Sequence, residues 1–292
     1  MANHLRLKTI TETLAVQPRQ LFAPGSVARW VAESRAGRNS QVAVLEIAGR
    51  DSIAAGVQAF ENGTATHFVP TVVFNGGTRG CPADLEFALG VLEAHVPPDA
   101  IGEPVLVGDP GFWEALTVRN LDVMIRHFGV YPGVIACHLY VHLVQVPLCR
   151  QLQVERIITG ERERHDGEVK LSQTPEVLDT YVEALGDSGI ALTQPLRSVE
   201  SGAAVEAMLA PELWAGGERQ LCCVLSGGYR RANGEVSYGP GRDYSPEGNR
   251  RYLRQFAVPF AIEYIRRVCA SEDVDVARLS AEYSERCDVG SK

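Results

Sequence analysis

Short apolar segments alternate with longer amphipathic segments along residues 41–210, and this alternation restricts the possible folds more than any other feature. Two parallel strands need a long crossover, usually a helix, so the alternation predicts βαβ units and a parallel sheet. We expect strands at residues 41–47, 67–74, 104–107, 154–159 and 190–193. We expect helices at residues 26–34, 53–60, 82–95, 112–128, 136–152, 175–185, 201–209 and 249–269. The predicted fold class is α/β, a doubly wound parallel sheet with helices on both faces.

Three regions are expected along the chain. Residues 1–40 form an N-terminal helical segment, residues 41–210 form the α/β core, and residues 211–292 form a C-terminal extension that completes a substrate pocket. With 292 residues, 45% of them hydrophobic, the chain is long enough to bury a large core.

The charge balance disfavours some partners. Lys and Arg number 28 against 36 Asp and Glu, which gives a net charge of −8. Such a surface argues against sequence-independent nucleic-acid binding, which depends on neutralising phosphates, but leaves room for one cationic pocket. No apolar run approaches the roughly 18 to 20 residues of a membrane span, and no secretory signal opens the chain. We therefore expect a cytoplasmic protein with a small-molecule substrate and no membrane contact, and we leave a homodimer open.

Cysteine and histidine spacing predicts no protein metal site. Seven cysteines, an odd number, occur without a C-x-x-C pair, which is typical of free thiols in a reducing compartment. Cys222 and Cys223 are adjacent; one of them could carry sulfur as a nucleophile, but we interpret them as small core residues. His138 and His142 lie one helical turn apart, yet no H-E-x-x-H motif is present. We interpret both histidines as packed or hydrogen-bonded residues on an apolar helix.

The turn after the first predicted strand is the first candidate site, because ligands of open α/β sheets bind at the carboxyl ends of strands. Its residues are Ala48, Gly49, Arg50, Asp51 and Ser52, and they form neither a Walker A loop nor a G-x-G-x-x-G fingerprint. The small residues let backbone amides approach a ligand, and a hydroxyl at a helix N-terminus suits a phosphate or pyrophosphate. The alternative is that Asp51 and Ser52 only cap the helix.

This turn resembles that of the PP-loop ATP pyrophosphatase family, which usually reads S-G-G-x-D-S. The chain keeps Gly49, Asp51 and Ser52, but has Ile47 and Ala48 where the family has serine and glycine. The resemblance implies a Rossmann-like ATP-binding fold in which ATP lies with its pyrophosphate on residues 48–52.

Later segments follow the same order, and their layout is most similar to the 7-cyano-7-deazaguanine synthase branch over roughly residues 40–210. The resemblance implies ATP contacts at Phe74, Gly160 and Glu161, and a substrate contact at Gln173. The zinc cysteines of that branch are not matched, because adjacent cysteines cannot supply a tetrahedral thiolate set. We therefore expect a relative without zinc.

Two further groups of polar residues are candidates. A glycine-rich loop could form a second anion or substrate site through Ser226, Gly227, Tyr229, Arg230 and Arg231, although an ordinary turn with solvated arginines is the alternative.

The second group follows the predicted strand at residues 154–159. Glu161 or Asp166 could contact Mg²⁺ or ribose, or could belong to a solvated loop, and both readings stay open. Lys170 and Arg197 are expected to meet transferring phosphates.

The resemblance implies an ATP-dependent adenylating enzyme that uses ATP and Mg²⁺. A carboxylate or carbonyl oxygen would attack the α-phosphorus, pyrophosphate would leave, and a nitrogen or sulfur nucleophile would displace AMP. Arg50 would offset pyrophosphate charge, Ser52 would donate to it, and Asp51 would orient the loop or hold Mg²⁺. The alternatives are a nucleotide-binding protein without turnover and a sulfur-inserting enzyme that acts on a nucleobase or tRNA.

Overall fold

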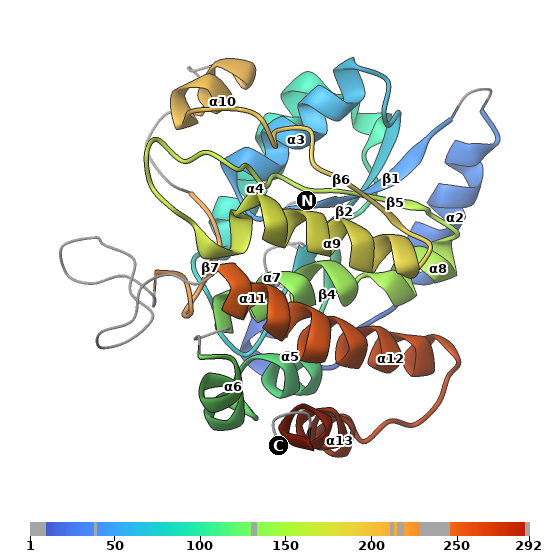
Figure 1. Ribbon diagram of the computed structural model, residues 1–292. Helices are drawn as coiled ribbons and strands as arrows, with labels where there is room; N and C mark the ends of the chain where they lie inside the picture. The colour runs from blue at the N-terminus through green and yellow to red at the C-terminus, as the bar shows by residue number, and fades with distance from the viewer. Residues whose placement is uncertain are drawn as a thin grey trace.

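A five-stranded parallel sheet forms the centre of the protein (Figure 1). The computed structural model describes residues 10–37, 40–129, 133–210, 213–214, 219–227 and 246–289. The strands of the sheet are β1 (Val42–Glu46), β2 (His67–Val73), β4 (Val105–Val107), β5 (Arg156–Ile158) and β6 (Ala191–Thr193). Their order is β4-β2-β1-β5-β6, and every neighbouring pair is parallel. The predicted α/β, doubly wound class is confirmed.

Strand β1 lies at the middle of the sheet, and the chain leaves it in both directions. The first three strands run outward from β1 through β2 to β4, after which the chain returns to the other side of β1 and adds β5 and β6. The order therefore reverses between β1 and β5. At such a reversal the two loops that follow the strands separate, which opens a crevice at their carboxyl ends.

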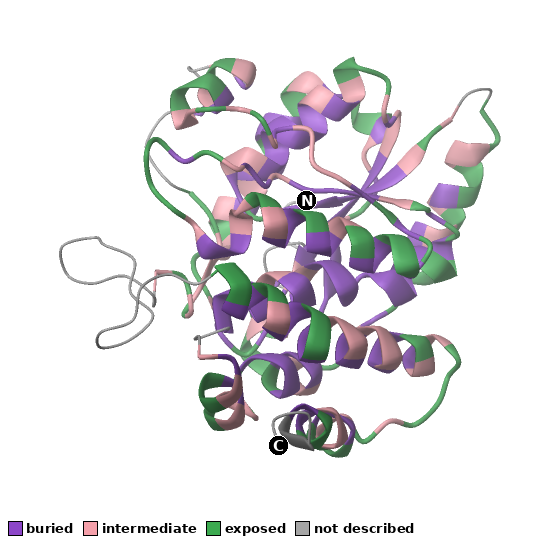
Figure 2. Ribbon diagram, viewed as in Figure 1, coloured by how far each residue is buried: buried purple, intermediate pink, exposed green. Residues whose placement is uncertain are grey.

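Helices cover both faces of the sheet (Figure 1). One face carries α3 (Arg50–Glu61), α4 (Pro82–His95) and α10 (Gly202–Met208). The other face carries α2 (Gly25–Arg35), α5 (Pro110–Thr117), α7 (Gly133–Leu143), α8 (Val146–Leu152) and α9 (Pro175–Asp187). Outside this second layer lie α6 (Leu121–Phe128), α11 (Pro246–Tyr252), α12 (Val258–Cys269) and α13 (Val276–Val289). Figure 2 shows that the buried sides of these helices face inward.

The two faces of β1 supply two separate hydrophobic cores because successive strand residues point to opposite sides. Val44 belongs to the core under α7, whereas Ala43 and Leu45 belong to the core under α3. All three are at most 1% exposed. A strand buried on both faces is what the uninterrupted apolar run in the sequence predicts.

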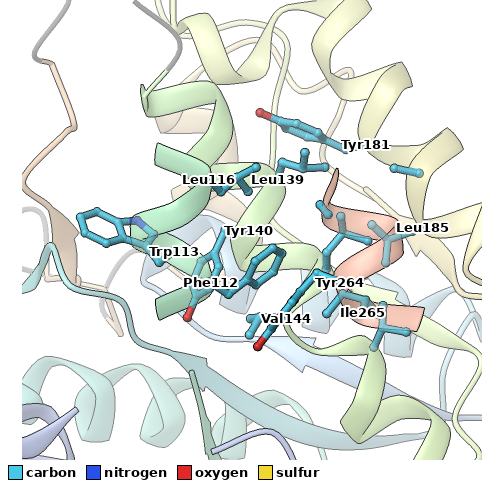
Figure 3. Close-up of a cluster of buried hydrophobic side chains, with 14 of the residues drawn as sticks. Phe112, Trp113, Leu116, Leu139, Tyr140, Val144, Tyr181, Leu185, Tyr264 and Ile265 are labelled. Atoms are coloured by element: carbon cyan, nitrogen blue, oxygen red, sulfur yellow. The ribbon is translucent and has the colours of Figure 1, made fainter. Parts of the chain in front are cut away.

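The C-terminal helices are part of the larger core, as Figure 3 shows for the aromatic cluster between α5, α7 and α12. The rings of Phe112 and Tyr264 are stacked with centroids 4.5 Å apart, and Tyr140 lies against Phe112 at 5.5 Å. The Tyr140 hydroxyl donates to the Phe74 carbonyl at 2.8 Å. Helix α12 therefore holds α5 and α7 in place behind the sheet.

Three predicted helices are interrupted. Residues 112–128 form α5 and α6, and residues 136–152 lie in α7 and α8, where Pro147 has no N–H to donate to Leu143. Residues 249–269 contain a π-helical turn at Leu253–Ala257, just before Pro259. Helix α13 and the short antiparallel pair β3 (Thr78–Arg79) and β7 (Cys222–Cys223) were not predicted.

Helices α7 and α8 together also correct the expectation about apolar runs. Gly133–Leu152 spans 20 residues and is apolar enough to cross a membrane by composition, but 83% of its most apolar window is buried inside the protein. Such burial is typical of a core helix in a soluble protein.

Candidate functional site

A pocket of about 400 Å³ opens where the turns after β1 and β5 separate. Its walls come from these two turns, from α7, from residues 168–173 and from residues 219–227. The volume lies within the range of small-molecule sites, roughly 300–1,000 Å³, and the position is the reversal of strand order where α/β proteins bind ligands.

Most of the residues predicted from the sequence line this one pocket. They are Ala48, Gly49, Arg50, Asp51, Ser52, Gly160, Glu161, Lys170, Gln173, Ser226 and Gly227. The structure thus brings together segments that are far apart along the chain. The predicted substrate residues Tyr229, Arg230 and Arg231 lie outside the described residues.

Two predicted site residues lie elsewhere. Phe74 is fully buried against the Gly108 backbone, where a Cβ would lie 2.5 Å from its ring, so it fills the core rather than contacting a nucleotide. The Arg197 guanidinium pairs with Glu163 at 2.5 Å and Asp179 at 2.7 Å, away from the pocket. The family resemblance was a poor guide for Phe74, and nearness in sequence to a charged turn was a poor guide for Arg197.

The Ser52 hydroxyl closes the turn after β1. It accepts hydrogen bonds from the backbone N–H groups of Ala48 at 3.0 Å and Gly49 at 3.1 Å, and donates to the Gly49 carbonyl at 2.7 Å. Gln220 covers the turn, since a Cβ on Gly49 would lie 2.6 Å from the Gln220 Cβ. For Ser52, the arrangement matches the capping alternative, because both amides already have a partner.

Asp51 is shared between two arginines. Its carboxylate accepts from Arg50 Nε at 2.9 Å and from Arg162 Nε at 2.8 Å, while Arg50 also reaches Glu206 on α10 at 2.7 Å. The Arg162 side chain is only 3% exposed. Asp51 therefore fixes the start of α3 to the loop after β5.

A buried histidine lies between two carboxylates at the base of the pocket. His142 Nδ1 is 3.0 Å from Glu46 Oε2, and His142 Nε2 is 3.2 Å from Glu161 Oε1. Gln145 donates to the same Glu46 oxygen at 2.8 Å, and Thr71 donates to Gln145 at 2.6 Å. Glu46 ends β1 and Glu161 follows β5, so this network joins the two sides of the crevice.

Charge is stabilised across this network. Burial opposes protonation of His142, but the Glu161 and Glu46 carboxylates outweigh it and raise the His142 pKa to about 10. Burial raises the pKa of Glu161, yet His142 and His138 hold it well below its usual range. His142 is therefore an imidazolium at neutral pH.

The same three residues have spacing compatible with a metal ion. Donor atoms of Glu46, His142 and Glu161 lie within 4.8 Å of one another, the one such group in the described part of the chain. With a proton on each ring nitrogen, His142 hydrogen-bonds Glu46 through Nδ1 and pairs with Glu161 through Nε2, a contact that has the distance but not the angle of a hydrogen bond. These contacts need no metal cation. A metal ion at this position would have to displace one of these protons.

His138 connects the network to the pocket. Its Nδ1 lies 3.9 Å from Glu161 Oε1, its side chain is 32% exposed, and it lines the pocket one helical turn before His142. His142 is packed and hydrogen-bonded, as expected. His138 is not fully packed, because it also faces the pocket. The second Glu161 oxygen, Oε2, is buried without a hydrogen-bond partner among the described residues.

Cationic side chains reach the same pocket. Lys170 and Arg219 line it, and the Arg219 guanidinium lies 4.4 Å from the centroid of the Phe87 ring. Cys222 and Cys223 also line the pocket and are only partly buried. Cys223 packs against the larger hydrophobic core, so the interpretation as core residues holds in part for Cys223 and fails for Cys222. Cations, a helix N-terminus and a His–Glu pair in one cavity suit an anionic ligand that exchanges protons.

Comparison with known proteins gives one informative result. No model of a known protein family matches the chain. The uncharacterized protein MJ0009 of Methanocaldococcus jannaschii is 30% identical over 230 residues, which is 77% of this chain and 80% of that protein.

Proposed function

The chain belongs to the family of the uncharacterized protein MJ0009 of Methanocaldococcus jannaschii, and we propose that it is an enzyme that transfers protons on a small anionic metabolite. The observation that carries this proposal is the pocket-facing His138 against the buried Glu161–His142 pair. A partly exposed imidazole backed by a fixed carboxylate is a common arrangement for general acid–base catalysis.

Each residue of this network has a distinct role in the proposal. His138 exchanges a proton with the substrate, because it lines the pocket and histidine is the side chain that most often serves as a general acid or base. Glu161 orients His138, while His142 keeps Glu161 ionised. His142 is a positioning residue, since it is fully buried between Glu161 and Glu46, and Glu46 lines the pocket on its other side.

The anionic part of the substrate would bind on the other side of the pocket. Lys170, Arg219 and the N-terminus of the 12-residue helix α3 lie there. Carboxylate and phosphate groups are the ligands that such groups favour. A pocket of about 400 Å³ accommodates a metabolite of modest size.

The test begins with ligand screening. Thermal-shift measurements with carboxylate and phosphate metabolites identify ligands of the wild type, and NMR then follows their conversion. We expect His138→Gln to keep the binding but to lose turnover by about 10²- to 10⁴-fold, the usual size of a general acid–base contribution. His127→Gln on α6, outside the pocket, is the matched control. Full turnover by His138→Gln would rule out the proposal.

An ATP-dependent adenylating activity is the second candidate. It is supported by the turn at residues 48–52, which lines the pocket together with Lys170 and Glu161. In this candidate ATP and Mg²⁺ bind there, a carboxylate or carbonyl oxygen of a small molecule is adenylated, and pyrophosphate leaves. The Ser52 hydroxyl would first have to release the amides of Ala48 and Gly49.

Calorimetric titration with ATP and Mg²⁺, repeated on Asp51→Ala, tests the second candidate. Equal affinity for the two proteins counts against it. ATP binding without pyrophosphate release under a panel of carboxylates and amines favours a nucleotide-binding protein without turnover. Sulfur insertion needs a reactive thiol, so it fails if Cys222→Ser and Cys223→Ser each keep full turnover.

We also propose a cytoplasmic protein whose partner is a small molecule rather than nucleic acid or membrane, with a homodimer left open. The net charge of −8 and the free cysteines are consistent with this.

A further inference from the structure

Two cysteines from distant parts of the chain meet in the wall of the pocket. Cys137 lies on α7 and Cys223 on β7, and their sulfurs are 3.4 Å apart. Cys137 is buried, Cys223 is partly exposed, and both line the pocket. Neither thiol takes part in the histidine–glutamate network described above.

The two sulfurs have different surroundings. Cys137 Sγ accepts hydrogen bonds from Trp113 Nε1 at 3.4 Å and from Asn75 Nδ2 at 3.6 Å. Cys223 Sγ accepts from the Leu225 N–H at 3.5 Å. The hydrogen bond with Cys137 lowers the pKa of Cys223 to about 6, whereas the pKa of Cys137 is raised well above its usual value. Cys223 is therefore the more acidic of the two thiols, and it is also the more exposed one.

We propose that Cys137 and Cys223 form a reversible disulfide on exposure to a hydroperoxide, and that this bond fastens β7 to α7 across the pocket wall. The Cys223 thiolate attacks the peroxide oxygen, the O–O bond breaks, and a sulfenic acid and water are formed once the leaving hydroxide takes a proton. Cys137 then loses its proton and attacks the Cys223 sulfur, and the hydroxyl leaves as a second water. In sum, two thiols and hydrogen peroxide give one disulfide and two waters.

The bond would link a short surface strand of the pocket wall to a helix of the core. The sulfurs need to approach from 3.4 Å to about 2.05 Å, the length of a disulfide bond. Besides its two-residue pairing with β3, the segment that contains β7 is held by backbone hydrogen bonds from Leu221 to Ala48 at 3.2 Å and from Val224 to Gly77 at 2.9 Å, whereas α7 is fixed in the core. A covalent link to α7 would therefore further restrict the motion of residues 219–227, which form one wall of the pocket.

Cys222 provides the internal control. Like Cys223, Cys222 is partly exposed and lines the pocket. Neighbouring residues of a strand point to opposite faces, so its thiol does not face Cys137 and instead donates to the Gln220 carbonyl at 3.9 Å. Among the described cysteines, none has its sulfur in contact with that of Cys222.

The experiment maps the bond directly. Full-length protein is treated with a small excess of hydrogen peroxide, remaining thiols are alkylated, and unreduced peptides are identified by mass spectrometry. We expect a peptide pair joined through Cys137 and Cys223 in the wild type and in Cys222→Ser, reversed by a dithiol and absent in Cys223→Ser. In Cys137→Ser we expect a trappable sulfenic acid on Cys223.

Two results overturn the proposal: both thiols alkylated after oxidation, or a cross-link made through Cys222. If Cys137→Ser does not fold, the wild type and Cys222→Ser alone decide the question. Hydrogen exchange of residues 219–227 tests the structural consequence. Slower amide exchange of residues 219–227 after oxidation supports the proposal that the disulfide restricts this segment, and unchanged exchange refutes it.

Discussion

Gly160 lies directly on the peptide that joins Asp51 to Ser52, so closely that a Cβ at position 160 would be 2.5 Å from the Asp51 carbonyl carbon. Gly160 follows β5 and Asp51 begins α3 after β1, so this contact joins the two turns on either side of the pocket. A glycine is needed here because of space, not because of a left-handed backbone. The shape of the pocket therefore depends on this close approach.

Replacing Gly160 with alanine should force these turns apart. We expect Gly160→Ala to lower the free energy of unfolding by about 1–3 kcal/mol, the usual cost of overpacking. Denaturant unfolding measures the change. Gly90→Ala is the matched control, since Gly90 lies in α4 with nothing within 4 Å of a Cβ, and helical alanine should be neutral or stabilising by up to about 1 kcal/mol. Equal destabilisation by both substitutions would contradict the packing argument.

His142 should make stability fall in alkaline solution. Its pKa is raised from 6.5 to about 10, so its contribution is complete below pH 6.5 and is lost as the pH rises towards 10. Glu161 has the opposite sign: its pKa is lowered from 4.5, so its contribution is present above pH 4.5 and is lost as the solution becomes more acidic. Both contributions are present together between pH 4.5 and 6.5.

The variant His142→Gln tests this dependence. We expect it to lose about 3–5 kcal/mol at neutral pH, because two buried carboxylates lose their cationic partner. We also expect a flatter decline of the unfolding free energy between pH 6.5 and 10 than in the wild type. His95→Gln, whose ring contacts only the Leu209 carbonyl in the described hydrogen bonds, should keep the wild-type slope. Identical slopes for wild type and His142→Gln would refute the assignment.

Much of the fold follows from the apolar pattern of the sequence. The five parallel strands are predictable because each is a short apolar run, although β6 is not buried on both faces. The bounds of α4 match the prediction, which rests on its helical period and its leading Pro82. The break between α7 and α8 could be predicted from Pro147, whereas the break between α5 and α6 involves no proline. The two-residue strands β3 and β7 carry no periodicity that could reveal them.

The site was predictable in position but not in chemistry. The rule for carboxyl ends of strands correctly placed residues 48–52 and 160–161 in one pocket. It could not show that Ser52 turns inward to the amides of its own turn. Glu46 offered a missed signal, since a carboxylate that ends a buried strand needs a partner. The His138–His142 spacing offered another, but only the fold brings Glu161 to both rings.

Asp51 should contribute to stability through Arg162. Asp51→Ala leaves the guanidinium of Arg162, 3% exposed, without its carboxylate, and we expect a loss of about 1–3 kcal/mol, less than for a fully buried pair because Asp51 is 26% exposed. The control is Asp122→Ala. Asp122 is 80% exposed and pairs with Arg126 on the surface, so its loss should cost less than about 1 kcal/mol. Similar unfolding free energies for both variants would show that the Asp51 pair is not structurally important.

Cys223 should be the most reactive thiol at neutral pH. Its pKa of about 6, set by the hydrogen bond from Cys137 against the opposing effect of burial, makes it a thiolate at pH values where ordinary thiols are protonated. We expect its alkylation rate by iodoacetamide to be nearly constant above neutral pH and to fall below pH 6. The alkylation rate of a free cysteine in a model peptide should instead keep rising with pH to about 8.5. In Cys137→Ala, Cys223 should follow the model-peptide profile more closely, because its hydrogen-bond partner is gone. Parallel profiles for Cys223 and the model peptide would exclude a thiolate at this position, and site-resolved mass spectrometry measures the rate at Cys223.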